Sequence, residues 1–363
     1  MLIDLIAGAR PNFIKMAPII EAIKKQIDLG ENIKFRLIHT GQHYDDDMSA
    51  QFFKALEIPN PDINLGAGGG TQSEQTSTIM VGYERLLAKS KSDLCLVVGD
   101  VNSTMACSIV AKKNNIKVAH VEAGIRSGDD SMPEEINRKV TDSISDFFFT
   151  TSLSATENLI KQGVNVDCIY FVGNVMIDTL YKFKSRFKKP EIWGEINLKK
   201  DNYILCTLHR PSNVDDRQKL LSIINEICEN VNNLPILFPV HPRTQLVLKK
   251  IKINHPNLFF TKPMGYLEFN YLTKNAKGVI TDSGGITEET TVMGVPCITV
   301  RNNTERPETV SIGTNELIGD NPEAIKPALN KLFKGQWKKG GIPEKWDGKS
   351  AERIVSNLIK ILK

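Results

Sequence analysis

The chain has 363 residues, of which 41% are hydrophobic and 24% are charged, and 46 basic against 42 acidic residues give a formal net charge of +4. This length predicts two domains, because one ordinary core rarely grows so large, and the composition is that of a soluble globular protein. The near balance of charge, with no basic run interleaved with aromatic residues, argues against nucleic-acid binding.

Strand-like runs alternate with segments of helical pattern along the whole chain. The runs in the first half are Leu2–Ala7, Lys34–His39, Asp93–Val98, Lys117–Val121, Asp146–Thr150 and Cys168–Val172. Those in the second half are Tyr203–Leu208, Ile236–Val240, Leu258–Thr261, Gly278–Thr281 and Pro296–Val300. The intervening helical segments include Asn102–Lys113 and Arg217–Glu229. The alternation predicts an α/β fold of two doubly wound, Rossmann-like domains, each with a mostly parallel sheet.

The domain boundary is expected near Phe187–Gly194, where charged residues, Pro and Gly cluster and periodicity is lost. We therefore predict an N-terminal domain over residues 1–175 and a C-terminal domain over residues 190–348. A last helical segment at 349–363 is expected to join the N-terminal domain. The longest apolar runs are strand-sized and Met1 enters a strand directly, so we expect a cytoplasmic protein with no signal peptide and no membrane span.

Polar residues and glycines gather directly after the strand-like runs of both halves. The segments concerned are Gly8–Pro11, His39–His43, Gly99–Asn102, Glu122–Arg126, His209–Pro211, His241–Arg243 and Asp282–Gly285. Open α/β sheets bind ligands beyond the carboxyl ends of their strands. Because both halves carry such residues, we predict one substrate cleft between the two domains.

A phosphate-binding turn is predicted where Thr281–Glu289 leaves a strand and opens a helix. Ser283, Gly284 and Gly285 then lie at the helix N-terminus, where free backbone N–H groups and the helix dipole favour an anion. Glu289, one turn further on, can hold hydroxyl groups of the moiety that bears the phosphate. The alternative is an ordinary helix start with a capping serine.

Basic residues elsewhere strengthen the phosphate interpretation. Arg10 with Lys15, and Arg306, can contact phosphate oxygens, which a guanidinium pairs with in a bidentate manner. The alternative for Arg306 is a structural ion pair with Glu305 or Glu308. Together with the helix start, the basic residues predict a diphosphate ligand.

Candidates for acid–base chemistry are the residues Asp100, Glu122, Glu134, Glu135 and His209. They follow strands or begin helices, where a carboxylate can be partly desolvated and its proton affinity tuned. For Glu135 we favour a simpler role, a surface charge that complements the helix dipole. His209 has the alternative role of a capping or core histidine.

Several chemistries are disfavoured by missing motifs. The sequence has no H-E-x-x-H, no calcium loop and no C-x-x-C, and its six cysteines lie inside apolar segments, so we expect neither a metal site nor disulfides. Neither a G-x-S-x-G elbow nor a G-x-G-x-x-G turn after the first strand is present, which disfavours serine hydrolysis and hydride transfer. Proton abstraction, elimination and glycosyl transfer remain open.

Ordered motifs over nearly the whole chain resemble the non-hydrolysing UDP-N-acetylglucosamine 2-epimerases, a family with the two-domain glycosyltransferase-B fold. The matching motifs are Gly8–Pro11, Lys15–Pro18, Thr40–His43, Gly99–Asp100, Ser103–Thr104, His120–Arg126, Pro133–Arg138, His209–Arg210, Thr281–Glu289 and Thr304–Glu308. The resemblance implies interconversion of UDP-GlcNAc and UDP-ManNAc without an external cofactor. It also implies anti elimination of UDP to 2-acetamidoglucal, followed by re-addition.

The resemblance further implies roles for individual residues. Catalytic residues are expected at Asp100, Glu122, Glu134 and His209. Binding of UDP is expected from Arg10, Lys15, Ser283, Gly284, Gly285, Glu289 and Arg306, and Gln42 and His43 match a possible allosteric site. Which carboxylate is the base stays open, with Asp100 and either Glu122 or Glu134 preferred, while His209 is expected to contact the diphosphate.

The resemblance also implies a homodimer that takes a UDP-sugar substrate. Alternative functions are 2-epimerisation of another UDP-2-acetamido sugar such as a diacetamido uronic acid, hydrolytic epimerisation, and glycosyl transfer. Departures from the commonest members, such as Ala9 before Arg10 and Tyr44 after His43, admit such a related substrate.

Overall fold

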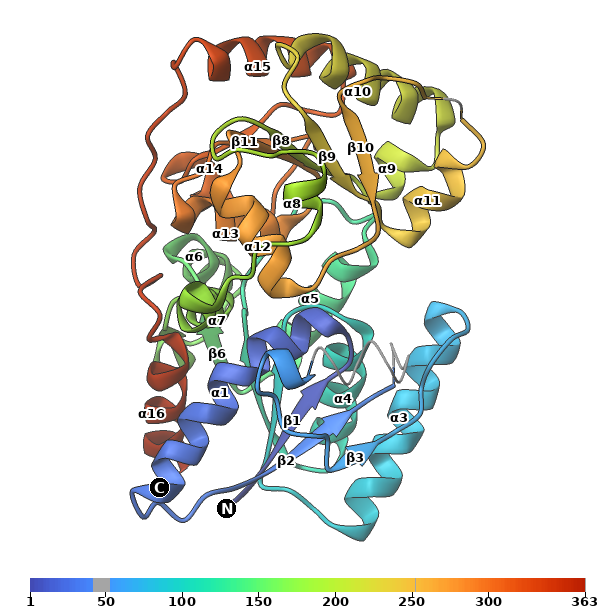
Figure 1. Cartoon of the computed structure of the whole chain (residues 1–363). Coiled ribbons are helices and arrows are strands. Elements are labelled where there is room, and N and C mark those ends of the chain that lie inside the picture. Colours follow the sequence, from blue (N-terminus) through green and yellow to red (C-terminus); the bar gives the residue numbers. More distant parts are fainter. Residues whose placement is uncertain (42–52, 252, 363) are drawn as a thin grey trace. The chain divides into compact units, whose positions relative to one another are not determined.

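A computed structural model describes residues 1–41, 53–251 and 253–362 of the chain (Figure 1). The chain divides into two compact units. Unit 1 consists of Met1–Lys182 together with Glu344–Lys363, and unit 2 consists of Phe183–Pro343. Each unit is an α/β sandwich around one parallel sheet, so the predicted fold class, two Rossmann-like units, is confirmed.

Unit 1 is built on a seven-stranded sheet in the order β3-β2-β1-β4-β5-β6-β7 within the described residues. All its neighbouring strands pair in parallel. The strands are β1 (Leu2–Ala7), β2 (Lys34–His39), β3 (Ile63–Asn64), β4 (Leu94–Val98), β5 (Lys117–Val121), β6 (Phe147–Thr150) and β7 (Ile169–Phe171). The chain winds outward in both directions from β1 and β4, so the topological switch point lies between these two strands.

Helices cover both faces of this sheet (Figure 1). They are α1 (Arg10–Asp28), α3 (Gln72–Lys89), α4 (Asn102–Lys113), α5 (Pro133–Ile144), α6 (Leu153–Lys161), α7 (Val175–Phe183, whose last residue belongs to unit 2) and α16 (Ser350–Leu362), with a 3-10 turn η1 at Val166–Cys168. On one face, Val97 of β4 packs in a single cluster with Ile79 of α3 and Val110 of α4. Every residue of β4 is buried, as expected for a strand covered on both faces, and the apolar run Leu94–Val98 follows from that.

A proline inside α1 explains one contact between helices. Pro18 has no N–H, so the carbonyl of Ile14, four residues earlier, lacks its usual partner in the helix. The Thr179 hydroxyl of α7 donates a hydrogen bond of 2.7 Å to that carbonyl. The missing backbone bond is thus replaced by a link between α1 and α7.

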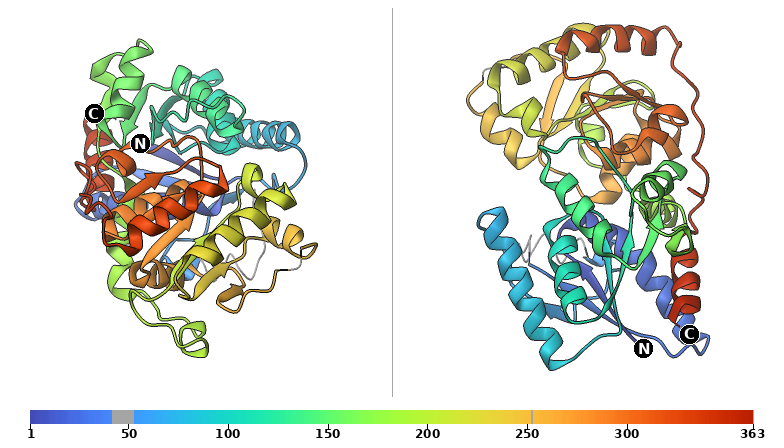
Figure 2. Two further views of the ribbon diagram at one scale, coloured as in Figure 1. Left: turned by 90° about the horizontal axis from the view of Figure 1, so that it is seen from above. Right: turned by 180° about the vertical axis from the view of Figure 1, so that it is seen from behind.

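The C-terminal segment of the chain packs onto the N-terminal one. Helix α16 lies beside α1 in Figures 1 and 2, and Lys25 pairs with Glu352 at 3.0 Å. The first amides of α16, those of Ser350 and Ala351, donate to the buried Asp178 carboxylate at 3.1 and 2.6 Å. An acidic group at a helix N-terminus satisfies amides that lack partners and complements the dipole, so Asp178 of α7 fixes where α16 begins.

Unit 2 repeats the same plan with a six-stranded parallel sheet in the order β10-β9-β8-β11-β12-β13. The strands are β8 (Ile204–Thr207), β9 (Ile236–Pro239), β10 (Leu258–Thr261), β11 (Gly278–Thr281), β12 (Cys297–Thr299) and β13 (Asn315–Leu317). The helices are α8 (Ile192–Glu195), α9 (Pro211–Val214), α10 (Arg217–Asn230), α11 (Pro242–Leu248), α12 (Tyr266–Asn275), α13 (Gly284–Met293), α14 (Pro307–Ser311) and α15 (Ile325–Phe333), with 3-10 turns η2 at Lys184–Arg186 and η3 at Pro322–Ala324. The switch point of this sheet lies between β8 and β11.

Both faces of the unit 2 sheet are buried as well. Ile204 of β8 packs in one cluster with Leu220 of α10 and Leu329 of α15. The next residue, Leu205, lies in a second cluster with Leu272 of α12. Successive side chains of a strand point to opposite faces, so β8 holds two helical layers at once.

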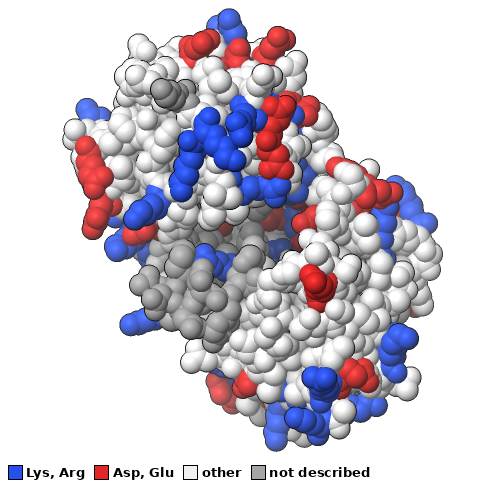
Figure 3. All heavy atoms as spheres, turned by 90° about the vertical axis from the view of Figure 1, so that its right-hand side faces the viewer, with Lys and Arg blue, Asp and Glu red and all other residues white. Residues whose placement is uncertain are grey.

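The described residues also bear on membrane spans, metal-binding groups, cysteines and surface charge. In the described residues, no helix is long and apolar enough to cross a membrane, and no group of His, Cys, Asp and Glu side chains is placed to hold a metal ion. All six cysteines are free thiols, and Cys168 alone among them is half-buried instead of buried. Acidic and basic side chains are interspersed on the face seen in Figure 3, as the near balance of charge leads one to expect.

Candidate active site

The carboxyl edge of the unit 1 sheet brings together the candidates of the first half. Strands β1, β4 and β5 are adjacent, and each leads into one of the predicted segments. Arg10 begins α1 after β1, Asp100 follows β4, and Glu122 follows β5 directly. These residues therefore lie next to the switch point, where open parallel sheets bind ligands.

Glu122 is a buried carboxylate held by a lysine. Lys15 Nζ lies 2.6 Å from Glu122 Oε2, and both side chains are about nine-tenths buried or more. The backbone of Glu122 has a φ of +70°, which is uncommon for a residue other than glycine. Its amide donates to the carbonyl of Phe149 in β6 at 2.9 Å, which helps hold this conformation. Such strained positions gather at functional sites.

The backbone at position 99 favours glycine next to this pair. Its φ is +71°, and a Cβ there would lie 3.4 Å from Lys15 Nζ and 3.6 Å from Glu122 Oε2. A Cβ would thus make ordinary contact with the ion pair, and the cost of a side chain at this position comes from strain of the left-handed backbone.

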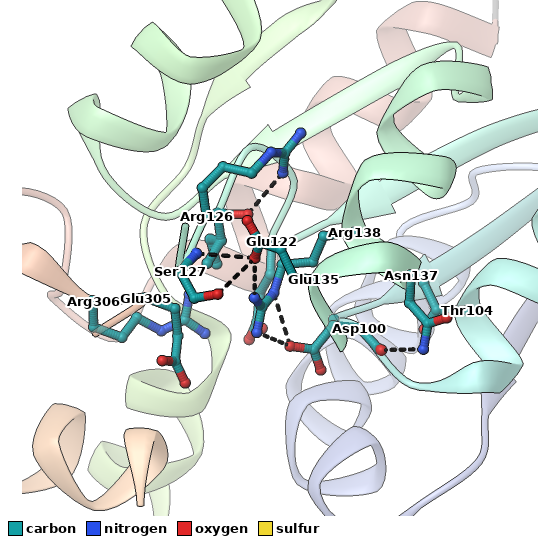
Figure 4. Close-up of polar contacts among 12 residues, drawn as sticks. Asp100, Thr104, Glu122, Arg126, Ser127, Glu135, Asn137, Arg138, Glu305 and Arg306 are labelled. Carbon is teal, nitrogen blue, oxygen red and sulfur yellow. Dashed lines mark hydrogen bonds and ion pairs between the residues drawn. The ribbon is translucent and has the colours of Figure 1, made fainter. Parts of the chain in front are cut away.

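Asp100 is fixed by an arginine from α5, as Figure 4 shows. Arg138 Nη2 and Nε lie 2.6 and 3.0 Å from Asp100 Oδ2, and Asn137 donates to the Asp100 carbonyl at 2.8 Å. The Asp100 side chain keeps 30% of its surface exposed. It is thus oriented but still accessible.

Glu135 is not the surface charge that we expected from the sequence. Its side chain is buried and accepts hydrogen bonds from the amide and the hydroxyl of Ser127, at 2.9 and 3.0 Å, and from Arg138 at 2.5 Å. Burial alone would raise the pKa of Glu135, but the Ser127 and Arg138 contacts bring it below its usual value. The expectation was wrong because helical periodicity places Glu135 and Arg138 on the buried face of α5, where each satisfies the other.

The other two candidates of unit 1 are more open. Glu134, the neighbour of Glu135 in the first turn of α5, is half-buried and has no ion pair or hydrogen bond among the described residues. Arg10 is half-buried in the first turn of α1, and its Nε has no hydrogen-bond partner among those residues. Both are therefore available for a ligand.

His209 in unit 2 is oriented by a buried aspartate. Its Nδ1 lies 2.8 Å from Asp282 Oδ1, and its ring is about one-third exposed. Asp282 also accepts from the amides of His209 and Arg210 and from the Asn213 side chain. Burial alone would raise the pKa of Asp282, but these contacts, led by His209, hold it below its usual value. Nε2 of His209 is therefore the nitrogen left to face a ligand.

The predicted phosphate turn opens α13 as expected from the sequence. Ser283 is the N-cap residue, and its side chain makes no capping hydrogen bond within the described residues. Gly284 and Gly285 form the first helical turn, and all three residues are half-buried. A Cβ on Gly284 would lie 2.6 Å from Glu305 Oε1, so a side chain there would displace the Glu305 carboxylate. The geometry suits an anion better than an ordinary serine cap.

Glu289 lies inside helix α13 and has a raised pKa. Asn270 Nδ2 of α12 lies 3.3 Å from its Oε1, and Tyr266 lies against it. Burial raises the pKa of Glu289 to about 7, although Asn270 and Tyr266 act to lower it. The carboxyl is therefore poised between its two protonation states near neutral pH.

Arg306 is held in a buried ion pair with a different partner from those expected. Its Nε lies 2.5 Å from Glu288 Oε1, with both side chains buried. Glu305 pairs instead with Arg301 at 2.7 Å. Burial alone would raise the pKa of Glu305, but Arg301, Arg210 and Arg306 lower it to about 2. Arg306 is thus a fixed cation in an arginine-rich cluster.

A cavity of about 290 Å³ lies at the carboxyl edge of the unit 2 sheet. It is lined by Thr207, Leu208, His209, Pro239, His241, Pro263, Met264, Phe269, Ser283 and Ile286. His209 and Ser283 thus share one cavity with apolar side chains, as in sites for nucleotides that need both a polar and an apolar wall.

Sequence reasoning missed the residues that orient the candidates. Arg138 and Asp282 contact Asp100 and His209 directly, yet we assigned no role to either from the sequence. The spacing of Glu135 and Arg138 by three residues on a helix was the available signal for the first. Gln42 and His43, the possible allosteric residues, lie outside the described residues.

Comparison with known proteins decides the family. A sequence model of the family described as UDP-N-acetylglucosamine 2-epimerase matches residues 25–359. The chain belongs to the UDP-N-acetylglucosamine 2-epimerase family. A curated relative in this family, the UDP-N-acetylglucosamine 2-epimerase of Methanocaldococcus jannaschii, is 43% identical over 98% of both chains. A UDP-N-acetylglucosamine 2-epimerase homolog of Methanococcus maripaludis is 46% identical over 92% of both.

Solved structures of the family share the fold of this chain. The crystal structure of the M. jannaschii UDP-GlcNAc 2-epimerase in complex with UDP-GlcNAc and UDP matches with a TM-score of 0.89 and 42% identity, over 99% of this chain and 100% of that one. The family assignment and the fold expected from the sequence motifs are both confirmed.

Proposed function

We propose that this chain is a UDP-N-acetylglucosamine 2-epimerase that interconverts UDP-GlcNAc and UDP-ManNAc by elimination and re-addition of UDP. Membership of the family supports the reaction, and the carboxylates of unit 1 support the mechanism. The observation that carries the proposal is the placement of Asp100 and Glu122 after adjacent strands, each bound by a cation that orients it.

The reaction requires a base, an acid and a retained leaving group. A carboxylate removes the proton at C2, the C1–O bond breaks, and its electrons leave with the diphosphate of UDP. The C2–H electrons form the C1=C2 bond of 2-acetamidoglucal. A proton then adds to C2 on the opposite face as a diphosphate oxygen re-forms the bond to C1. No electrons are gained or lost, so no redox partner is needed.

Two groups are needed, because the proton leaves one face of C2 and arrives on the other. The three candidate carboxylates lie in different electrostatic surroundings: Glu122 is paired with Lys15, Asp100 with Arg138, and Glu134 is unpaired among the described residues. We propose that Asp100 acts with Glu122 or Glu134 in this exchange. A positioned acid or base typically contributes about 100-fold to 10,000-fold in rate.

Unit 2 is proposed to hold UDP throughout. The N-terminus of α13 at Ser283, Gly284 and Gly285 would bind the diphosphate, with His209 contacting it from the same cavity. Glu289 would accept hydrogen bonds from the ribose hydroxyls. We propose that Arg10, Lys15 and Arg306 supply positive charge that stabilises the diphosphate as it departs. Retaining UDP prevents hydrolysis of the glycal and allows re-addition.

The decisive experiment is incubation with UDP-GlcNAc in deuterated water. The expected result is UDP-ManNAc with deuterium at C2 in both nucleotide sugars. Absence of both the isotope and the epimer would overturn the proposal. Glu157→Gln, which removes an exposed carboxylate on α6, serves as the matched control and should leave the exchange unchanged.

Single variants identify the base. A variant lacking the base for UDP-GlcNAc should form neither glycal nor deuterated substrate. A variant lacking only the group on the opposite face should still release UDP and 2-acetamidoglucal but yield no UDP-ManNAc. Asp100→Asn, Glu122→Gln and Glu134→Gln, followed by nuclear magnetic resonance, separate the two classes.

Other activities in the same fold give different products in the same assay. Hydrolytic epimerisation would release free ManNAc and UDP in proportion to turnover, and glycosyl transfer would need an acceptor and leave C2 unexchanged. A panel that includes a UDP-diacetamido uronic acid tests the sugar preference. The higher rate with UDP-GlcNAc is expected.

We also propose a cytoplasmic homodimer, on the strength of the resemblance to the family. Light scattering coupled to gel filtration should give twice the chain mass of 40.5 kDa. A monomer under assay conditions would contradict the proposed assembly without affecting the proposed reaction.

A further inference from the structure

Behind the carboxylates of unit 1 lies a buried cluster of three charged or titratable side chains: His120, Asp142 and Arg126. His120 Nδ1 lies 2.6 Å from Asp142 Oδ1, and Arg126 Nη1 lies 2.6 Å from Asp142 Oδ2. His120 and Asp142 are almost fully buried, and Arg126 is about one-eighth exposed. None of the three is among the groups that the proposed reaction uses.

Both nitrogens of the histidine ring have hydrogen-bond partners. Its Nε2 lies 2.9 Å from the carbonyl oxygen of Gly99, and a carbonyl can only accept, so Nε2 carries a proton. Asp142 Oδ2 accepts from the Gly124 amide at 3.0 Å and lies 2.6 Å from Arg126 Nη1, so both oxygens of Asp142 are engaged. Burial alone would raise the pKa of Asp142, but His120 and Arg126 hold it below its usual value. The other ring nitrogen, Nδ1, is engaged with Asp142 Oδ1, so both ring nitrogens of His120 have partners in the cluster.

Two hydrogen bonds link the cluster to two different turns: His120 bonds to the Gly99 carbonyl, and Asp142 accepts from the Gly124 amide. One is Gly99–Asp100, which follows β4, and the other is Glu122–Gly124, which follows β5. Gly99 is bound to β5 twice, because its amide also donates to the Val121 carbonyl at 3.0 Å. Each turn contains one of the proposed catalytic carboxylates and residues in left-handed conformations, with φ of +71°, +70° and +77° at Gly99, Glu122 and Gly124.

We propose that His120 and Asp142 are positioning residues, forming a buried clamp that holds the turn of Asp100 and the turn of Glu122 at a fixed separation. The inference rests on the proposed function, because it assigns these two carboxylates to one reaction. A hydrogen-bonded chain runs from the Gly99 carbonyl through His120 and Asp142 to the Gly124 amide. A shift of about 1 Å in either turn is enough to cost about 100-fold in rate.

Two substitutions at His120 divide the clamp into its halves. In His120→Gln the amide nitrogen takes the place of Nε2 and can still donate to the Gly99 carbonyl, while the bond to Asp142 is lost. In His120→Asn the amide nitrogen takes the place of Nδ1 and can still donate to Asp142, while the bond to Gly99 is lost. The two variants thus remove similar parts of the ring but break different links.

The clamp predicts distinct kinetics for the pair. His120 lies in β5, so its bond to Gly99 ties the turn of Asp100 to that strand directly, and losing this bond in His120→Asn should lower kcat by about 100-fold. His120→Gln cuts the link to Asp142 but keeps the bond to Gly99, so kcat should fall by less, to within about 10-fold of the parent. The KM for UDP-GlcNAc should change less than about 3-fold in both, since the groups proposed to hold UDP are elsewhere. Asp178→Asn, which weakens the cap of α16, is the stability control and should lower the unfolding midpoint without changing kcat.

Amide hydrogen exchange provides a readout that does not need activity. His120→Asn should speed exchange in the peptide containing Gly99, and Asp142→Asn should speed it in the peptide containing Gly124. If both His120 variants lost kcat equally, in proportion to lost folded protein, and exchange at these amides stayed at the parent rate, the clamp would be refuted. If the parent protein itself failed to exchange C2 of UDP-GlcNAc, the proposed function would fail while the exchange data still tested the clamp.

Discussion

Replacing either of two adjacent glutamates on α13, Glu288 or Glu289, by glutamine should change the free energy of unfolding in opposite directions. Glu289 has a folded-state pKa of about 7 because of burial, against an ordinary 4.5. The folded state therefore binds more protons than the unfolded state between these two values, and stability falls as pH rises from about 4.5 to about 7. With about 1.4 kcal/mol for each pH unit of separation, the ionised carboxylate costs about 3 kcal/mol at pH 8. Removing the charge removes this cost.

The prediction is that Glu289→Gln raises the free energy of unfolding by up to about 3 kcal/mol at pH 8 and by less than about 1 kcal/mol at pH 5, where the folded carboxyl is already neutral. Glu288→Gln should instead destabilise the protein by up to about 5 kcal/mol, because it breaks the buried ion pair between Glu288 and Arg306. Glu289→Gln should also bind UDP more weakly if the carboxylate contacts ribose.

Urea unfolding followed by tryptophan fluorescence measures both changes, because Trp193 and Trp337 belong to unit 2. The pair should be measured at pH 5 and pH 8 at one ionic strength. If Glu289→Gln stabilised the protein equally at both pH values, or destabilised it at pH 8, the ionised Glu289 carboxylate would not be the source of the free-energy cost.

Three further substitutions test other parts of the structure. Glu122→Gln should lower kcat by about 100-fold to 10,000-fold, measured by formation of UDP-ManNAc, and activity near the parent level would exclude Glu122 as an acid or base. Asp282→Asn should lower kcat/KM by about 10-fold to 100-fold, because the tautomer and orientation of His209 are no longer fixed. The circular dichroism spectrum should stay unchanged, and unaltered kinetics would show that Asp282 does not orient His209 for the reaction. Asp178→Ala should reduce the free energy of unfolding by about 1 to 3 kcal/mol in urea titrations, because two amides of α16 lose their acceptor, and full stability would show that water replaces the carboxylate.

Sequence periodicity predicted most strands of the sheets because both faces of each sheet are buried. Strands such as Lys117–Val121 and Gly278–Thr281 coincide with β5 and β11. The edge strands β3 and β13 were not predicted, because their sequences, Ile63–Asn64 and Asn315–Leu317, mix polar and apolar residues and carry too little apolar pattern. The apolar edge strands β7 and β10 were predicted although they are only partly buried, so the apolar pattern decided which strands the sequence revealed.

The site divides in a similar way. Residues next to strand ends, such as Asp100 and Glu122, could be found from the sequence, because the parallel topology alone gathers them. Partners such as Arg138 and Asp142 come from the interior of a helix, where a polar residue usually faces solvent. Their burial depends on packing between α5 and the sheet, and a local pattern does not encode that packing. Glu135 was misjudged for the same reason.

The position of α16 also bears on how the protein folds during synthesis. Unit 1 is complete only with residues 344–363, whose helix α16 is capped by Asp178 and contacts α1, so the ribosome translates the whole of unit 2 before unit 1 is complete. Domains generally fold as units as they emerge. Unit 2 is therefore expected to complete its fold before unit 1, and a chain halted before residue 344 should retain a folded unit 2 beside an N-terminal segment that chaperones can still bind.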